Sequence, residues 1–257
     1  MKRRSKALLA ITLLSPGLAF AACDVRSGSA TAALVELYTS EGCSSCPPAD
    51  KRLTGFSSAT HALDKVVPLS LHVDYWDDLG WKDPFAQAGF AERQRWLVNA
   101  NGHKTVFTPH FFVSGKEVRD WRGDLAQELK RATAEPARAN IRLRAEPAPS
   151  GTIAIAGSVS LPSPSIKGDV ALFVAVTEDK LVSNISAGEN RGVTLLHDHV
   201  VRELIGPSAL QDGDTRLKRT VTVRRTWNAA ELGVVAFVQD RLSGQVLPAA
   251  GASQCLA

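Results

Sequence analysis

Cys43 and Cys46 are separated by two serines, and this Cys-x-x-Cys spacing is the part of the sequence most capable of chemistry. The apolar run 33–38 predicts a strand before the pair, and Pro47 and Pro48 predict a helix that begins near Cys46. A helix N-terminus favours thiolate over thiol, because its free N–H groups and its dipole stabilise negative charge. We therefore expect Cys43 to be the exposed attacking sulfur and Cys46 to resolve the mixed disulfide. Pro47 and Pro48 cannot donate backbone hydrogen bonds, which weakens the activation expected of Cys43.

The same pair could instead form a structural disulfide or hold a soft metal such as copper or zinc. Metal would need ligands beyond two thiolates, and one Cys-x-x-Cys without a second pair is a weak zinc signal. His72 and Asp74, at the exit of a second predicted strand, are candidates to shuttle protons or bind metal beside the thiolate. Glu36, on the strand before the pair, is a candidate proton acceptor for Cys46. His72 and Asp74 could instead only form hydrogen bonds at the end of their strand. Glu36 could instead face solvent or form an ion pair.

Further polar residues stand in the second half of the chain. His197 and His199 are two residues apart and would share one face of a strand, as a metal pair requires, but no third ligand is evident. Residues 189–191 form a polar Glu-Asn-Arg run that could contact the first half of the chain. No cofactor is predicted.

The other two cysteines, Cys23 and Cys255, lie at opposite ends of the chain. The simplest pairing joins them in a disulfide, which would close a very long loop and stabilise the fold substantially. The alternative is that the small residues before Cys23 form a lipoprotein box. Lipidation of Cys23 would anchor the protein to a membrane and leave Cys255 unpaired.

The first 21 residues read as a secretory signal peptide, with basic residues, a short apolar run and an Ala-Phe-Ala cleavage site. The run is too short and broken for a membrane anchor, which needs roughly 20 apolar residues. The predicted location is periplasmic or secreted, with no transmembrane span in the mature chain. Removing the leader leaves 26 basic and 26 acidic residues, so the charge of +4 belongs to the leader and nucleic acid is not an expected partner.

The elements that must position the Cys43–Cys46 pair alternate between strands and helices. They include a strand at 66–73, a helix from Asp83-Pro84 to Asn101-Gly102, a hairpin over 110–118 and a helix over 124–134. This order predicts a central mixed sheet covered by helices.

The pattern changes at 145–149, which reads as a proline-rich linker. After it come short apolar or alternating segments at 152–161, 169–177, 193–204, 217–224 and 232–240. Several short strands at such spacing predict an antiparallel sandwich. The sequence thus predicts two domains after the signal peptide at 1–21, one at 22–144 and one at 145–257.

The run ELYTSEGCSSC, followed by Thr108-Pro109 before a hairpin, resembles the thioredoxin and glutaredoxin superfamily. The resemblance implies an α/β thioredoxin-like first domain, a cis-proline at Pro109 and substrate docking by Thr108. His110 then becomes a candidate substrate contact. Tyr75 and Trp76 lie in an inserted aromatic stretch that could grip substrate or could equally be core.

A narrower resemblance covers nearly the whole mature chain. The stretches GCSSCPPAD, HVDYWDDLGWKDPF, TPHFFVSG and HDHVVREL resemble the exported bacterial family known as domain of unknown function 1223. This family implies a thioredoxin-like domain plus a β-domain, without an assigned reaction.

The leading hypothesis is a thiol–disulfide oxidoreductase acting on thiols or disulfides of exported proteins, together with an unidentified redox partner. The alternative is a non-catalytic binding module with a structural disulfide or a soft-metal site. The sequence leaves the direction of the redox chemistry, the substrate and the oligomeric state undefined.

Overall fold

The computed structural model describes residues 22–57, 65–161, 169–210 and 214–256. The predicted signal peptide at 1–21 lies outside these ranges. Within them, no helix is both long enough and apolar enough to cross a membrane.

The central feature is an eight-stranded mixed sheet with the strand order β14-β13-β8-β11-β3-β2-β4-β5. Its first-half strands are β2 (Ala33–Thr39), β3 (Val66–His72), β4 (His110–Val113) and β5 (Lys116–Val118). Its second-half strands are β8 (Val170–Glu178), β11 (Val200–Ala209), β13 (Leu232–Asp240) and β14 (Val246–Ala252). Strand β3 runs parallel to both β2 and β11, whereas the other neighbours are antiparallel.

Three α-helices are found in the described ranges: α1 (Pro47–Thr54), α2 (Ala88–Ala100) and α3 (Leu125–Ala134). Every residue of β2 is buried, so both of its faces need cover. Val35 and Leu37 point to a core shared with α1 and α3, and Leu34 and Tyr38 point to a core shared with α2. Alternation along β2 thus assigns each side chain to one helix layer.

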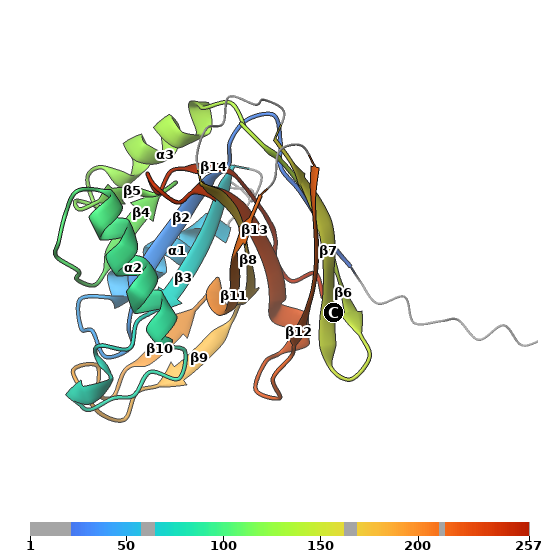
Figure 1. The fold of residues 1–257 in the computed structure, drawn as a ribbon. Helices are drawn as coiled ribbons and strands as arrows, with labels where there is room; N and C mark the ends of the chain where they lie inside the picture. The colour runs from blue at the N-terminus through green and yellow to red at the C-terminus, as the bar shows by residue number, and fades with distance from the viewer. Residues whose placement is uncertain (1–21, 58–64, 162–168, 211–213, 257) are drawn as a thin grey trace, which may run out of the picture.

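A second sheet of four antiparallel strands packs on the other side of the second-half strands. Its order is β1 (Cys23–Arg26), β6 (Asn140–Ala148), β7 (Thr152–Ser160) and β12 (Asp214–Thr222). Figure 1 shows β6, β7 and β12 as a separate layer on the side of the eight-stranded sheet opposite α2. Apolar side chains of this sheet and of β8 and β13 fill the core between the layers. The predicted disulfide between Cys23 and Cys255 is present and joins β1 to the chain beyond β14.

The predicted fold class, an α/β thioredoxin-like domain followed by an all-β sandwich-like domain, is wrong. The chain is mostly β, and its second-half strands extend the sheet of the first half instead of forming a separate sandwich. The two halves join where Val200 of β11 pairs with Ser70 of β3. Strand β8 is buried along its whole length, and its apolar residues contribute to the cores on both faces of the sheet. In a separate sandwich, one face of β8 would be exposed to solvent, and its side chains on that face would not be buried.

The predicted linker at 145–149 is also wrong, because Ala145 to Ala148 continue β6 and pair with β7. The predicted domain boundary at 144/145 therefore falls inside a strand. Strand β1, from the first half, pairs with β6 across the same boundary.

Several local predictions are confirmed. The hairpin has the predicted strands β4 and β5, with Ser114 and Gly115 at positive φ in its turn. Helix α3 starts after Asp124, as expected. Helix α2, however, begins at Ala88, with Gln87 as its N-cap residue, rather than beside Asp83.

Candidate site around the Cys43–Cys46 disulfide

Cys43 and Cys46 form a disulfide at the point where β2 leads into α1. Cys46 is the N-cap residue of α1 and Pro47 is the first helical residue. The loop is tight, since the Cys43 amide donates to Ser40 O and the Cys46 amide to Cys43 O, each at 3.1 Å. Both cysteines are 0% exposed, so the expectation of an exposed Cys43 is wrong for this bridged state.

The Thr108–Pro109 peptide lies against the dithiol loop and is cis, as the superfamily resemblance implied. Ser45 Oγ donates to the carbonyl oxygen of Thr108 at 3.5 Å. Trp76 Nε1 donates to Thr108 Oγ1 at 2.8 Å and so fixes the side chain that precedes the proline. Trp76 thus holds the side chain of Thr108 in place.

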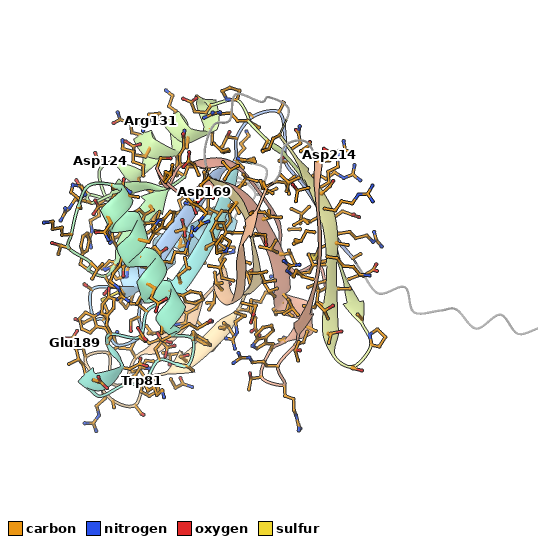
Figure 2. All side chains as sticks on the ribbon, viewed as in Figure 1. Trp81, Asp124, Arg131, Asp169, Glu189 and Asp214 are labelled. Atoms are coloured by element: carbon orange, nitrogen blue, oxygen red, sulfur yellow. A yellow bond between two sulfur atoms is a disulfide. The ribbon has the colours of Figure 1, made fainter. Side chains whose placement is uncertain are left out.

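A loop of the second half, residues 188–192, covers the dithiol loop. Asn190 Nδ2 donates to the carbonyl oxygens of Glu41 and Cys43, at 2.8 and 3.0 Å. Glu189 Oε2 accepts from the Ser44 amide at 3.0 Å. Figure 2 shows Glu189 and Trp81 at the same end of the molecule, and a Cβ on the neighbouring Gly188 would come within 3.1 Å of Trp81 Cβ. The polar loop predicted at 189–191 therefore contacts the first half of the chain.

Beneath the dithiol loop lies a buried polar cluster made by two histidines and their carboxylate partners. His72 Nδ1 contacts Asp83 Oδ2 at 2.7 Å, and His197 Nε2 contacts Glu41 Oε1 at 3.1 Å. The two imidazole rings meet edge to face, with centroids 5.0 Å apart. Asp83 also accepts from the Glu41 amide at 2.8 Å, which ties the two pairs together.

The polar cluster continues on α1 through Asp50, which is 7% exposed. Burial raises the pKa of Asp50, an effect that the nearby His197 and His72 oppose. Burial alone would lower the pKa of His72 and raise that of Asp83. Their contact outweighs burial in both cases, so the pKa of His72 is raised and that of Asp83 is lowered. The His72–Asp83 pair therefore favours its charged forms.

Other residues predicted for the site lie elsewhere. Glu36 forms an ion pair with Arg93, at 2.7 Å, on the α2 side of β2 and not on the α1 side that carries Cys46. Asp74 is half-buried and its carbonyl oxygen accepts from the Asp77 amide. Tyr75 is 38% exposed and donates to Gln94.

His110 is fully buried and turned toward Glu117, whose carboxylate its Nε2 meets at 2.9 Å. His197 and His199 do not form the pair once considered for a metal, because the chain turns between β10 (Thr194–His197) and β11, and His199 pairs with Asp179. In the described ranges, no group of three or more His, Cys, Asp or Glu side chains is placed so that it could hold a metal ion.

Sequence reasoning missed Asp50, Glu41 and the role of His197. Asp50 had a local signal, since it follows Cys46 by four residues and so shares its helix face. Glu41 and His197 are 156 residues apart, and no local pattern joins them.

Comparison with known proteins gives a family and a fold. The family model described as "Protein of unknown function (DUF1223)" matches residues 34–239. No curated protein matches the chain. The crystal structure of protein AGR_C_4864 from Agrobacterium tumefaciens is similar, with 24% identity, a TM-score of 0.59, and coverage of 90% of this chain and 96% of that one. HBP35 of Porphyromonas gingivalis is similar with 16% identity, a TM-score of 0.65, and coverage of 88% and 76%. These likenesses support the fold alone.

Proposed function

Because the chain belongs to the DUF1223 family of proteins of unknown function, its activity has to be argued from its own site, and we propose that it is a thiol–disulfide oxidoreductase. The working pair is Cys43 and Cys46. The substrates are thiols or disulfides of exported proteins, and a separate redox partner restores the pair.

One juxtaposition carries this proposal. The Cys43–Cys46 disulfide stands at the N-terminus of α1, and the Thr108 carbonyl lies within hydrogen-bond reach of the loop between the two cysteines. The dipole of α1 favours the thiolate that leaves when such a bridge is broken. Free N–H groups add little here, because Pro47 and Pro48 have none. The amides of Ala49 and Asp50 already donate to Cys46 O. The carbonyl and amide groups beside Pro109 offer backbone partners for an extended substrate segment.

In the oxidising direction, the Cys43–Cys46 disulfide accepts two electrons from substrate thiols. A substrate thiolate attacks Cys43 Sγ, the Cys43–Cys46 bond breaks, and Cys46 leaves as a thiolate that takes up a proton. A second substrate thiolate attacks the substrate sulfur of the mixed disulfide, which forms the substrate disulfide and releases Cys43. Two electrons have then passed from the substrate to the pair. The reverse sequence reduces a substrate disulfide.

Burial of both sulfurs requires an opening step before exchange. The loop 188–192 is the segment that must move, since Asn190 and Glu189 hold the backbone of the dithiol loop. Removing these contacts would expose Cys43 without disturbing α1. The closed form thus represents a resting oxidised state.

The proposal places the protein outside the cytoplasm, in the periplasm or secreted. The two disulfides are of the kind that persists in oxidising compartments. The bond between Cys23 and Cys255 is favoured over lipidation of Cys23, since that cysteine is already paired.

The first test is the reduction potential of the Cys43–Cys46 pair in glutathione redox buffers, read by alkylation of free thiols. A value between about −270 and −120 mV supports the proposal, because working exchange catalysts fall in that range. In the second test, Cys46→Ser should accumulate mixed disulfides with exported proteins and Cys43→Ser should abolish exchange. The Cys23→Ser/Cys255→Ser protein is the matched control and should retain exchange. A Cys43→Ser protein with unchanged activity would contradict the proposal.

A second candidate is favoured by the complete burial of both cysteines. In it, the Cys43–Cys46 bridge is structural and the protein is a non-catalytic binding module. It predicts a potential below about −300 mV and no reaction with thiols short of unfolding. The same titration therefore separates the two candidates.

A further inference from the structure

The polar cluster beneath the dithiol loop contains four buried side-chain atoms without a hydrogen-bond partner. They are Thr39 Oγ1, Asp50 Oδ1, His72 Nε2 and His197 Nδ1. These atoms come from the end of β2, from α1, from the end of β3 and from the end of β10. Thr39 and Asp50 lie close enough for their side chains to interact, so the two imidazole nitrogens are the atoms whose lack of a partner most needs an explanation.

The two imidazoles are oriented as metal ligands usually are. A ligating histidine normally holds its other ring nitrogen against a carboxylate, which fixes the ring and its tautomer. His72 meets this condition through Asp83, and His197 meets it through Glu41. The other ring nitrogen of each histidine, Nε2 of His72 and Nδ1 of His197, has no hydrogen-bond partner.

The carboxylates around the rings are themselves held in place. Asp83 accepts from the amides of Glu41 and Phe85, both at 2.8 Å. Glu41 accepts from Trp81 Nε1 at 2.8 Å. The outer groups of the cluster are thus fixed, and Asp50 and Thr39 are the side chains left to adjust.

The cluster also has a charge imbalance. Glu41, Asp50 and Asp83 are all buried, at 0%, 7% and 3% exposure. Among the hydrogen bonds and ion pairs of the described residues, none joins these three carboxylates to a lysine or arginine. The charged His72 compensates Asp83, so Glu41 and Asp50 are the buried carboxylates left without a cation. Buried carboxylates are costly unless a positive charge compensates them.

We propose that Asp50, His72 and His197 bind a divalent transition-metal ion such as Zn²⁺, with Thr39 Oγ1 or a water as a further ligand. Two imidazoles and one carboxylate are a common ligand set for this class of ion. The ion displaces the proton that the charged His72 carries on Nε2, and this proton is released to solvent. As they are placed, these side chains do not form a group that could hold a metal ion, so the proposed site requires Asp50 to turn toward the rings as the ion enters. This site is independent of the proposed redox function, because it uses no cysteine and forms while the disulfide is intact.

The test uses untagged mature protein with its disulfides intact, stripped with a chelator and titrated with ZnSO₄ in a calorimeter. Tight binding near one ion per chain is expected. His197→Gln and Asp50→Asn should each weaken binding at least about 10-fold. The matched control is His199→Gln, which removes another buried histidine outside the cluster and should leave zinc binding unchanged.

If the variants do not fold, anomalous diffraction from zinc-soaked crystals of the wild-type protein tests the proposal instead. An anomalous zinc peak between His72 Nε2 and His197 Nδ1 supports the proposal. Ordered water alone at that position, no binding by the wild-type protein, or equal losses in His197→Gln and His199→Gln would overturn it. The outcome is separable from the redox proposal, which the reduction potential tests without metal.

Discussion

Asn190 Nδ2 bridges the carbonyl oxygens of Glu41 and Cys43, although 147 residues separate it from Cys43. This side chain is the main polar connection between the second half of the chain and the loop that carries the disulfide. It stabilises the backbone conformation in which both sulfurs are buried. A residue far away in the sequence therefore holds the backbone of the loop that carries the Cys43–Cys46 pair.

We predict that Asn190→Ala accelerates reduction of the Cys43–Cys46 disulfide by dithiothreitol by about 10-fold or more. Two hydrogen bonds are lost, each contributing about 1 kcal/mol, so local opening becomes more frequent. The rate can be followed by alkylation and mass spectrometry. Asn99→Ala, at an exposed position of α2, should leave the rate unchanged. Equal rates in both variants would mean that the loop 188–192 does not control access.

The Glu36–Arg93 ion pair lies between β2 and α2, and Arg93 also donates to Gln239 of β13 at 2.8 Å. Arg93→Met should lower the free energy of unfolding by about 3–5 kcal/mol, because Glu36 is left as a buried unpaired charge. The double variant Arg93→Met/Glu36→Leu should recover a large part of this loss. Urea denaturation measures both. A double variant as unstable as the single one would show that charge burial is not the cause.

His110 should make the protein sensitive to mild acid. Burial lowers the pKa of His110 to about 4, against an ordinary value of about 6.5. Between these values the unfolded chain binds a proton that the folded chain does not, so the free energy of unfolding falls as the pH is lowered. The contribution from pH 7 to pH 5 is about 2 kcal/mol.

The measurement is urea denaturation at both pH values, for the wild type and for His110→Gln. The loss of stability between pH 7 and pH 5 should be smaller in the variant. A pH dependence that is the same in both proteins would exclude His110 as its source.

The Cys23–Cys255 bridge closes nearly the whole chain into a loop. The double variant Cys23→Ser/Cys255→Ser should lose about 2–5 kcal/mol of stability, chiefly because its unfolded state is less restricted. Thermal or urea unfolding measures the loss. The Cys43–Cys46 pair should remain bridged, and a change in its alkylation would show that the two disulfides are coupled.

The elements nearest the cysteines were predictable because their signals are local. The Ser114-Gly115 turn, the start of α3 after Asp124 and the prolines at the start of α1 each act within a few residues. The order of strands in the sheet was not predictable in this way. The apolar pattern of β11 marks a strand but carries no information about whether its neighbour is β3 or another strand of the second half.

Some residues of the candidate site likewise had a local signal in the sequence, and others did not. The spacing of Cys43 and Cys46 and the strand-exit position of His72 were visible in the sequence. The contacts of His197 with Glu41 and of Asn190 with Cys43 depend on the joining of β11 to β3, and they could not be foreseen without it. Asp83 was predicted to cap a helix. One of its carboxylate oxygens accepts from the Phe85 amide and the other contacts His72, but α2 begins only at Ala88.

The bond between Cys23 and Cys255 has a consequence for the order of events during biosynthesis. Cys255 follows Cys23 by 232 residues, so Cys23 has no native partner until β14 and the residues that follow it have been made. Throughout that time the neighbouring Cys43 and Cys46 are already present. A nascent chain that ends before Cys255 therefore contains three cysteines, of which only Cys43 and Cys46 are native partners. Formation of the bond between Cys23 and Cys255 then shows that β14 has been made and has packed against the rest of the fold.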